Sequence, residues 1–146
     1  MIIKLENEKD RTELEVRIRY NEKLHNVKQI EQLLQSLECK IPCNREKEIV
    51  WVLASDIYYI ESVDKRSFVY CKDEVYETEL RLYQLEEELK EAGFVRISKS
   101  CIVNIQVMQS IKPLRNSRLE ATLSNGEKLM VTRKYIHDIR TILEER

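Results

Sequence analysis

The sequence predicts an α+β fold that is mainly antiparallel β, with a few helices and a small β-β-α unit in front of it. Short apolar runs recur at close spacing after Glu48, turn-forming residues separate them, and helical periodicity is confined to a few stretches. The 146 residues suffice for one domain, or for one domain with a small appendage. We therefore expect an N-terminal unit over residues 1–45 and a main domain over residues 46–146.

The N-terminal unit is predicted from a change of period. Residues 13–20 alternate strictly, with apolar side chains at even positions and charged side chains at odd positions. This pattern is typical of a half-buried strand, which we expect to pair with a strand over residues 1–6. Apolar residues between Leu24 and Leu37 then recur at helical spacing, with Asn21 as the N-cap. Such a unit buries one face only, so it must pack on the rest of the chain or on a second copy.

The start of the main domain is predicted from composition and from turn signals. Residues 38–47 are charged, contain a proline and have no period, which predicts a linker. Residues 49–53 form a continuous apolar run, typical of a strand that is covered on both faces. Further strands are expected over the ranges 57–60, 67–71 and 75–78, joined by tight turns at Asp64-Lys65 and Lys72-Asp73.

The second half of the main domain begins with a predicted helix. Its inner face contains Leu82, Leu85 and Leu89, and Gly93 is placed to end it. Strand-like segments follow at 108–114 and 119–123. Asn125-Gly126 between alternating runs predicts a type I′ hairpin, and residues 135–143 predict a closing helix.

Charge is distributed unevenly along the chain, although its net value is only -1. Residues 1–95 contain 15 Lys and Arg against 21 Asp and Glu, whereas residues 96–140 contain 9 against 3. This asymmetry predicts a basic working surface beside an acidic remainder. The alternative is that these cations only make a β surface soluble.

Few residues are arranged as a catalytic or metal site requires. The two histidines stand alone on predicted helices, and two glycines cannot form a glycine-rich phosphate loop. Cys39 and Cys43 are not followed by a second pair at zinc spacing, so we expect no metal, no cofactor and no enzymatic activity. The absence of a secretory signal and of a long apolar run predicts a cytoplasmic protein with reduced cysteines. A remaining possibility is that the four thiols sense oxidation.

Two blocks near the C-terminus combine apolar anchors with cations and small polar residues, a composition suited to binding a polyanion. They are Phe94–Asn104 and Asn125–Tyr135. Together with the segments Tyr59–Ser62 and Leu80–Leu82, they resemble the signature of the LytTR family of DNA-binding domains. The four matches occur in the family's order, and the resemblance covers roughly residues 49–143.

The resemblance implies an elongated β fold that lies along duplex DNA and inserts loops into successive major grooves. It also implies that two copies bind paired sites. The positions that match the family's base contacts are Lys65, Arg66, Ser67, Ser98, Lys99 and Arg133. The residues expected at phosphates are Arg96, Asn104, Lys112, Arg115, Arg118, Lys134 and Tyr135. Arg96 and Asn104 have a structural alternative, in which Arg96 pairs with a carboxylate and Asn104 caps a turn.

The resemblance thus implies a bacterial transcription regulator. Only about 45 residues precede the matched region, so we expect the stand-alone type without a receiver domain and without control by aspartyl phosphorylation. The N-terminal unit is then expected to act as a dimer contact, or as the docking surface for a membrane-protein inhibitor. The alternative is a protein-interaction or adaptor module that works through this acidic unit and has no DNA partner.

Overall fold

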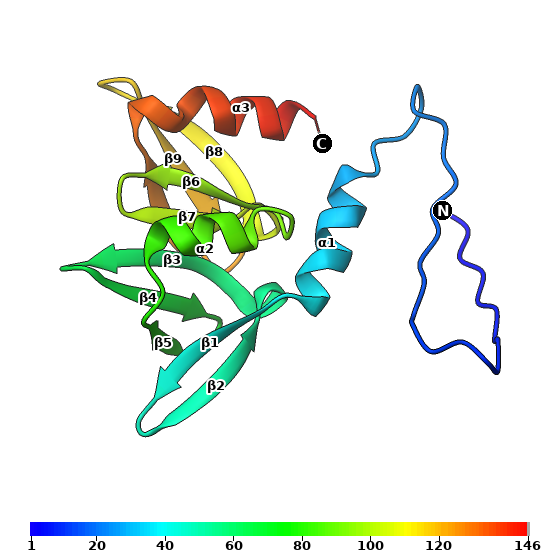
Figure 1. Cartoon of the computed structure of the whole chain (residues 1–146). Coiled ribbons are helices and arrows are strands. Elements are labelled where there is room, and N and C mark those ends of the chain that lie inside the picture. Colours follow the sequence, from blue (N-terminus) through cyan, green and yellow to red (C-terminus); the bar gives the residue numbers. More distant parts are fainter. Residues whose placement is uncertain (146) are drawn as a thin grey trace.

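The computed structural model describes residues 1–145, in which ten strands and three α-helices follow one another along the chain (Figure 1). The first elements are α1 (Lys28–Glu38), β1 (Lys40–Arg45), β2 (Glu48–Leu53), the 3-10 turn η1 (Ala54–Asp56), β3 (Ile57–Val63), β4 (Arg66–Cys71) and β5 (Val75–Thr78). They are followed by α2 (Leu82–Leu89), β6 (Phe94–Ser98), β7 (Cys101–Asn104), η2 (Ile105–Val107), β8 (Met108–Leu114), β9 (Arg118–Leu123), β10 (Lys128–Val131), η3 (Arg133–Tyr135) and α3 (Ile136–Glu144).

The strands form two antiparallel sheets. Seven strands pair in the order β2-β1-β5-β4-β3-β7-β6, and three pair in the order β10-β9-β8. Helix α2 covers one face of the large sheet, and the small sheet and α3 cover the other (Figure 1). The prediction of a mainly antiparallel α+β fold is confirmed.

The core has two halves because side chains of successive strand residues point to opposite faces. In β3, Ile60 packs with Leu85 and Leu89 of α2, whereas Tyr59 packs with the small sheet. In β7, Ile102 joins the first half and Val103 the second. Ile97, Ile102 and Val103, in the block Phe94–Asn104, lie in the core, and each is 0% exposed.

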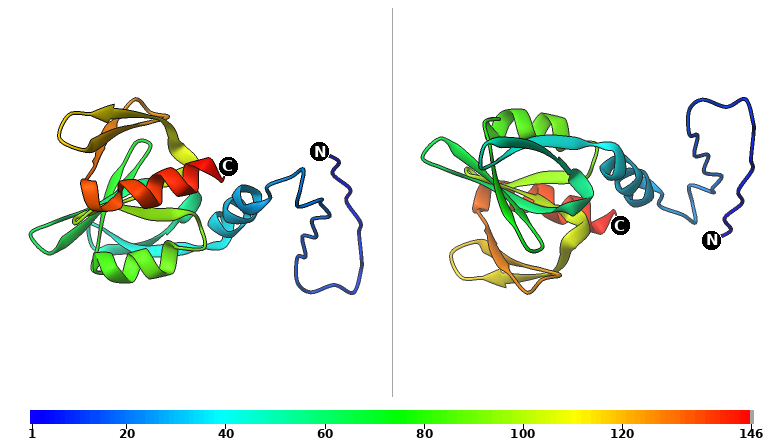
Figure 2. Two further views of the ribbon diagram at one scale, coloured as in Figure 1. Left: turned by 90° about the horizontal axis from the view of Figure 1, so that it is seen from above. Right: turned by 90° about the horizontal axis from the view of Figure 1, so that it is seen from below.

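The N-terminal strands predicted for residues 1–6 and 13–20 are not formed in this single chain. These residues contain no strand in the structure and form an extended arm that leaves α1 and runs away from the body (Figures 1 and 2). Alternation shows only that a segment can pair, and a two-stranded hairpin by itself is marginal in water. The predicted helix exists as α1 but begins at Lys28, after Val27 rather than Asn21.

Two further predictions near the domain boundary are wrong. The expected linker contains β1, which pairs with β2 along its length and with β5 at Asn44. Proline has no N–H to donate to a neighbouring strand, so it is tolerated where strand pairing is short. Pro42 faces β5, which pairs with β1 only at Asn44, and its carbonyl accepts a hydrogen bond from the Thr78 hydroxyl at 2.8 Å. Strand β2 is an edge strand, so Ile49 and Trp51 are 68% and 62% exposed instead of covered.

The turns follow from local chemistry. Asp64 and Lys65 both have positive φ, as a type I′ hairpin requires. At the predicted Asn125-Gly126 hairpin only Gly126 has positive φ, and its N–H donates to the Leu123 carbonyl at 2.9 Å. The hairpin exists, but its loop is a type I turn closed by a glycine, not type I′.

Candidate nucleic-acid interface

Two backbone hydrogen bonds bring three loops to one edge of the molecule. The Ser62 N–H donates to the Ser100 carbonyl at 2.7 Å, which ties the end of β3 to the β6–β7 turn. The Thr132 N–H donates to the Ile97 carbonyl at 2.9 Å, which ties the start of η3 to the same turn. The β3–β4 hairpin, the β6–β7 turn and η3 therefore share one edge, at the left in Figure 1. We call these loops, with the β8–β9 turn described next, the loop edge.

The β8–β9 turn joins this edge from the small sheet. Leu119 at the start of β9 pairs with Val131 at the end of β10, directly before Thr132. The turn itself contains Asn116 and Ser117, both with positive φ. Its flanking cations, Arg115 and Arg118, are exposed.

The tip of the β3–β4 hairpin is held by side chains from outside it. The guanidinium of Arg81, at the N-cap of α2, donates to the Lys65 carbonyl at 2.8 Å. Arg66 donates to both carboxylate oxygens of Glu77, at 2.7 and 2.6 Å, and lies over the Phe68 ring. The Arg66 guanidinium lowers the pKa of Glu77 below its usual value through these hydrogen bonds. Arg66 is therefore already bound to a carboxylate, whereas the ammonium group of Lys65 has no carboxylate partner within residues 1–145.

The β6–β7 turn is shaped by Arg96. Its Nε donates to a Glu86 carboxylate oxygen at 2.7 Å, and its Nη1 donates to the Lys99 carbonyl at 2.6 Å. Within the turn, the Ser98 hydroxyl accepts from the Ser100 N–H at 3.3 Å. The structural alternative for Arg96 is therefore the one its contacts support, and the turn presents the Lys99 side chain outward.

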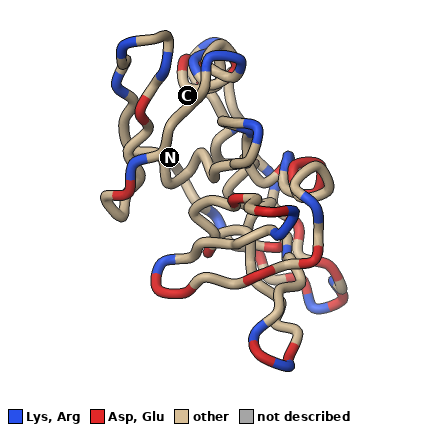
Figure 3. The backbone as a smooth tube through the Cα atoms, turned by 90° about the vertical axis from the view of Figure 1, so that its left-hand side faces the viewer, with Lys and Arg blue, Asp and Glu red and all other residues tan. Residues whose placement is uncertain are grey.

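Most of the predicted contact cations are exposed and without an ionic partner. Within residues 1–145, no carboxylate oxygen lies within 4.0 Å of the charged groups of Lys65, Lys99, Lys112, Arg115, Arg118, Arg133 or Lys134. Lys134 instead lies over the half-buried Tyr135 ring. Lys112 lies within β8, opposite Glu120 of β9, rather than in a turn. Seen from this side, basic and acidic segments are interspersed (Figure 3). Attraction to a polyanion thus depends on local unpaired cations.

Two predicted contact residues are not available to a ligand. Ser67 is 2% exposed. It lies in β4, between its cross-strand neighbours Ser62 of β3 and Thr78 of β5. Asn104 is 1% exposed, and its amide group donates to the Ile57 carbonyl and accepts from the Gln106 N–H. For Asn104 the structural alternative, a turn cap, is therefore the one its contacts support, and the buried position of Ser67 does not favour its predicted contact with DNA.

The cysteines do not support an oxidation sensor. Burial raises the pKa of Cys43 and Cys101 to about 12 and that of Cys71 to about 11. Burial also raises the pKa of Cys39, assisted by the charge of Glu88. Reactive thiols require a lowered pKa, so these raised pKa values do not favour the oxidation-sensing alternative.

The residues that hold the loops in place were not predicted from the sequence. Arg81 lies in a segment that matched the family signature, but nothing in the pattern indicated that it reaches Lys65. The Arg66–Glu77 pair had a usable signal: a hairpin around Lys72-Asp73 places Arg66 diagonally across from Glu77 on the neighbouring strand.

The fold and the loop edge together define a class: an antiparallel β domain that presents exposed cations on loops, as a nucleic-acid-binding domain does. The sequence pattern of the LytTr DNA-binding domain matches residues 47–144. This chain therefore belongs to the LytTR family of DNA-binding domains, as its motifs predicted.

Relatives of known name agree with this assignment. The chain is 35% identical to the sensory transduction protein LytT of Bacillus anthracis, over 67% of this chain and 40% of LytT. It is 30% identical to LytT of Bacillus cereus, over 82% of this chain and 48% of LytT. The matched region thus spans about half or less of these relatives. An uncharacterized HTH-type transcriptional regulator of Staphylococcus aureus (strain bovine RF122) is 28% identical, over 65% of this chain and 64% of that protein.

A solved structure has the same fold. The LytTr DNA-binding domain of a methyl-accepting/DNA response regulator from Bacillus cereus superposes with a TM-score of 0.67 at 25% identity. The superposition covers 72% of this chain and 96% of that domain. No helix within residues 1–145 is long and apolar enough to cross a membrane.

Proposed function

We propose that this chain is a sequence-specific regulator of transcription that binds double-stranded DNA through its loop edge. The observation that carries the proposal is the convergence of Lys65, Lys99 and Arg133 on one edge, tied together by the Ser62–Ser100 and Thr132–Ile97 hydrogen bonds. Arginine and lysine donate to the O6 and N7 acceptors of guanine in the major groove. Loops that project side by side from one edge can reach such acceptors along a duplex.

The roles within the interface are divided by position. Lys65, Lys99 and Arg133, with the Ser98 hydroxyl, are assigned to base edges because they stand at the positions that match the family's base contacts. The exposed cations beside them, together with the half-buried ring that Lys134 covers, are assigned to the phosphate backbone. These phosphate residues are Lys112, Arg115, Arg118, Lys134 and Tyr135. Arg66 and Arg96 act as positioning residues, since each is held by a carboxylate.

The wider setting follows from the proposed role. As a regulator that acts on promoter DNA, the protein works in the cytoplasm and binds paired repeat sites as a homodimer. Its N-terminal residues are then available for the dimer contact or for a membrane-protein inhibitor. The adaptor alternative is not favoured, because the family match covers a DNA-binding domain.

The experiment begins with operator selection from a random duplex pool, followed by titration of the selected duplex and an unrelated duplex against salt. Arg133→Ala is expected to cost about 1–3 kcal/mol of specific binding and to leave non-specific binding nearly unchanged. Arg118→Ala is expected to weaken binding to both duplexes and to lower the salt slope by about one unit.

Lys72→Ala is the matched control, because Lys72 is an exposed cation in the β4–β5 turn, at the end of β4 opposite the loop edge. It should change neither affinity. Failure to select any sequence would refute the proposal, and an equal loss of specific binding in the Lys72 and Arg133 variants would refute the assignment of the edge.

A further inference from the structure

The arm formed by residues 1–27 exposes an unusual amount of apolar surface. None of these residues is buried, and Leu14, Val16 and Tyr20 are 86%, 57% and 54% exposed. Both views in Figure 2 show the arm standing clear of the sheets and of α3. A segment whose alternation suits a strand therefore has its apolar face in water, which is unfavourable unless a partner covers it.

The charged face of residues 13–20 identifies the partner. Along it, Glu13 and Glu15 are followed by Arg17 and Arg19. In an antiparallel pair, residues directly opposite each other lie on the same face, and opposite charges there are favourable. When two copies pair about a two-fold axis at Val16, each Glu15 lies opposite an Arg17 and each Glu13 opposite an Arg19. The same register places Leu14 opposite Ile18 on the apolar face.

Other registers are disfavoured by the same charges. Moving the axis to Arg17 places two arginines opposite each other, and moving it to Glu15 does the same with two glutamates. An in-register parallel pair places every charge opposite its own kind, and a shift of one residue in the antiparallel pair sets the apolar side chains opposite the charged ones. The acidic-then-basic order thus selects one antiparallel, self-complementary register, as a two-fold interface requires.

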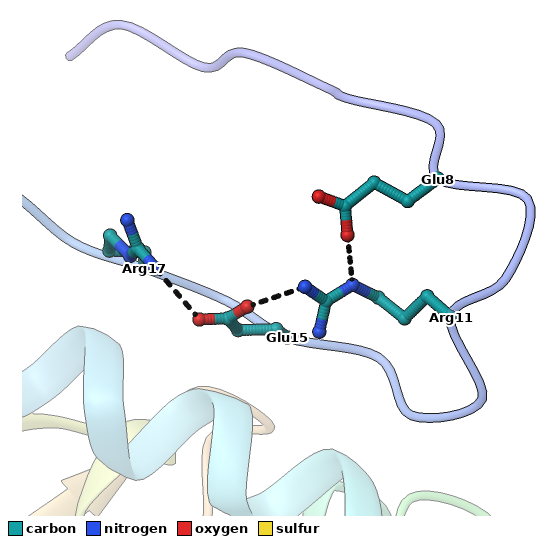
Figure 4. Close-up of polar contacts among 4 residues, drawn as sticks. All are labelled: Glu8, Arg11, Glu15 and Arg17. Atoms are coloured by element: carbon teal, nitrogen blue, oxygen red, sulfur yellow. Dashed lines mark hydrogen bonds and ion pairs between the residues drawn. The ribbon is translucent and has the colours of Figure 1, made fainter.

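The charged side chains of this face can exchange their ion pairs within the arm for ion pairs with a second copy. Arg17 contacts Glu15 at 3.2 Å, Arg11 contacts Glu15 at 3.1 Å, and Arg11 contacts Glu8 (Figure 4). The side chains of Glu15 and Arg17 are 45% and 70% exposed. Ion pairs this exposed contribute little to stability, so replacing them with pairs to a second copy costs little.

Other occupants fit less well. Residues 1–26 contain six Lys or Arg and six Asp or Glu, so the arm has no net charge that would draw it to DNA. The exposed edge of β2 presents Ile49 and Trp51 but no charge pattern along residues 49–53 that would select a register for the arm. A second copy of the arm is the partner that its charges complement.

We propose that residues 13–20 of two copies pair as antiparallel strands about a two-fold axis at Val16 and so form the dimer contact of this protein. The biological role of this dimer rests on the proposed DNA-binding function. The pairing of the two arms does not depend on it. Met1, Ile3 and Leu5 of each copy, also exposed, form the apolar face of an outer strand, which widens the pair to four strands.

The arm reaches the body through residues 21–27, which span at most about 24 Å when extended. The two DNA-binding bodies are therefore tethered by the arms rather than locked in one orientation. This allows each body to bind one of two sites arranged as a direct repeat, although the arms themselves are related by a two-fold axis.

The test is sedimentation equilibrium of the full chain over a range of concentrations. The unaltered chain is expected to form dimers, and Arg17→Glu is expected to weaken dimerisation at least about tenfold, because it sets acidic groups against Glu15. Glu15→Arg should do the same. The double variant Glu15→Arg/Arg17→Glu should restore the dimer constant, since the opposite-charge pairs are re-formed in reverse order. Lys9→Glu is the control of equal charge change outside the paired segment and should have no effect.

A second measurement checks the register by cross-linking. Residue 16 is the position that faces itself, so oxidation should yield disulfide-linked dimers faster for Val16→Cys than for Leu14→Cys or Ile18→Cys. A chain that stays monomeric, a dimer that Arg17→Glu does not weaken, or a double variant that is not rescued would each overturn the inference. A dimer abolished by Trp51→Lys would place the contact at the β2 edge and overturn it too.

Binding of the same variants to a duplex with a single site separates this inference from the proposed function. The charge variants should bind that duplex as the unaltered chain does, because the arm lies outside the loop edge. If no variant binds DNA while the charge variants still control dimerisation, the proposed function fails and the arm contact stands.

Discussion

At the scale of single residues, the loop edge contains cations of two kinds. Arg66 and Arg96 are held by Glu77 and Glu86, and they fix the shape of a hairpin and of a turn. Lys99 and Arg133 have no carboxylate partner within residues 1–145, and both are exposed at the loop edge. An arginine that already donates two hydrogen bonds to a carboxylate must lose them before it can bind a phosphate.

Releasing a held arginine should therefore increase general affinity for DNA. In Glu77→Gln, the bidentate pair with Arg66 is lost, and Arg66 becomes free to contact phosphate. Non-specific binding is expected to strengthen, with a salt slope steeper by about one unit. Glu79→Gln is the matched control, since it removes the same charge from the exposed neighbour of Thr78. Equal effects of the two substitutions would indicate a general charge effect and contradict the account of Arg66.

The thiols should be slow to react in the folded protein. With pKa values of about 11 to 12 for Cys43, Cys71 and Cys101, less than about one thiol in a thousand is ionised at pH 8. A disulfide-exchange reagent at pH 8 should therefore modify the native chain much more slowly than the chain in denaturant. Rapid native labelling of any of these three would contradict the assigned burial.

At the scale of elements, the β3–β4 hairpin is one of three turns within residues 1–145 in which residues other than glycine adopt positive φ; the other two contain Glu46 and Asn116-Ser117. Lys65 adopts a φ of 65°, where glycine is far better tolerated than a long side chain. Strain of this kind is concentrated at functional sites. The Lys65 side chain does not favour this turn conformation, which is compatible with its proposed contact to DNA.

Lys65→Gly should separate stability from binding. The substitution relieves the left-handed strain and is expected to raise the free energy of unfolding by up to about 1 kcal/mol, as measured by urea denaturation. Specific DNA binding should fall by roughly 1–3 kcal/mol in the same variant. Asp64→Gly, which relieves similar strain and keeps the cation, should stabilise without that loss. A Lys65→Gly variant that binds DNA normally would remove Lys65 from the interface.

At the scale of the whole molecule, the central strands join both halves of the core. Strand β3 directs Ile60 toward α2 and Tyr59 toward the small sheet, and β7 does the same with Ile102 and Val103. Neither half can open without exposing a strand that the other half also buries. The body is therefore expected to unfold as one cooperative unit.

Ile60→Ala tests this coupling. Removing a side chain that is 0% exposed should cost about 2–5 kcal/mol of unfolding free energy. Urea denaturation followed by far-UV and near-UV circular dichroism should still give coincident transitions, because both halves lose β3 together. Separate transitions for the two probes would show that the halves unfold independently.

Local patterns in the sequence were sufficient wherever a segment's neighbours are close in the chain. The hairpin at Asp64-Lys65 and the inner face of α2 were predicted from turn chemistry and periodicity, because both depend on residues a few positions apart. The family signature is local in the same sense, so the class of protein could be predicted as well.

Only the tertiary structure decided which segments find a partner and which side chains stay in water. Residues 13–20 and 40–45 show this in opposite ways: the alternating segment is unpaired, whereas the segment that contains Pro42 lies in the sheet. Likewise Ser67 and Lys65 belong to one hairpin, yet one is buried and the other is free. Strand pairing and burial depend on residues far apart in the chain, and a one-dimensional pattern does not record their contacts.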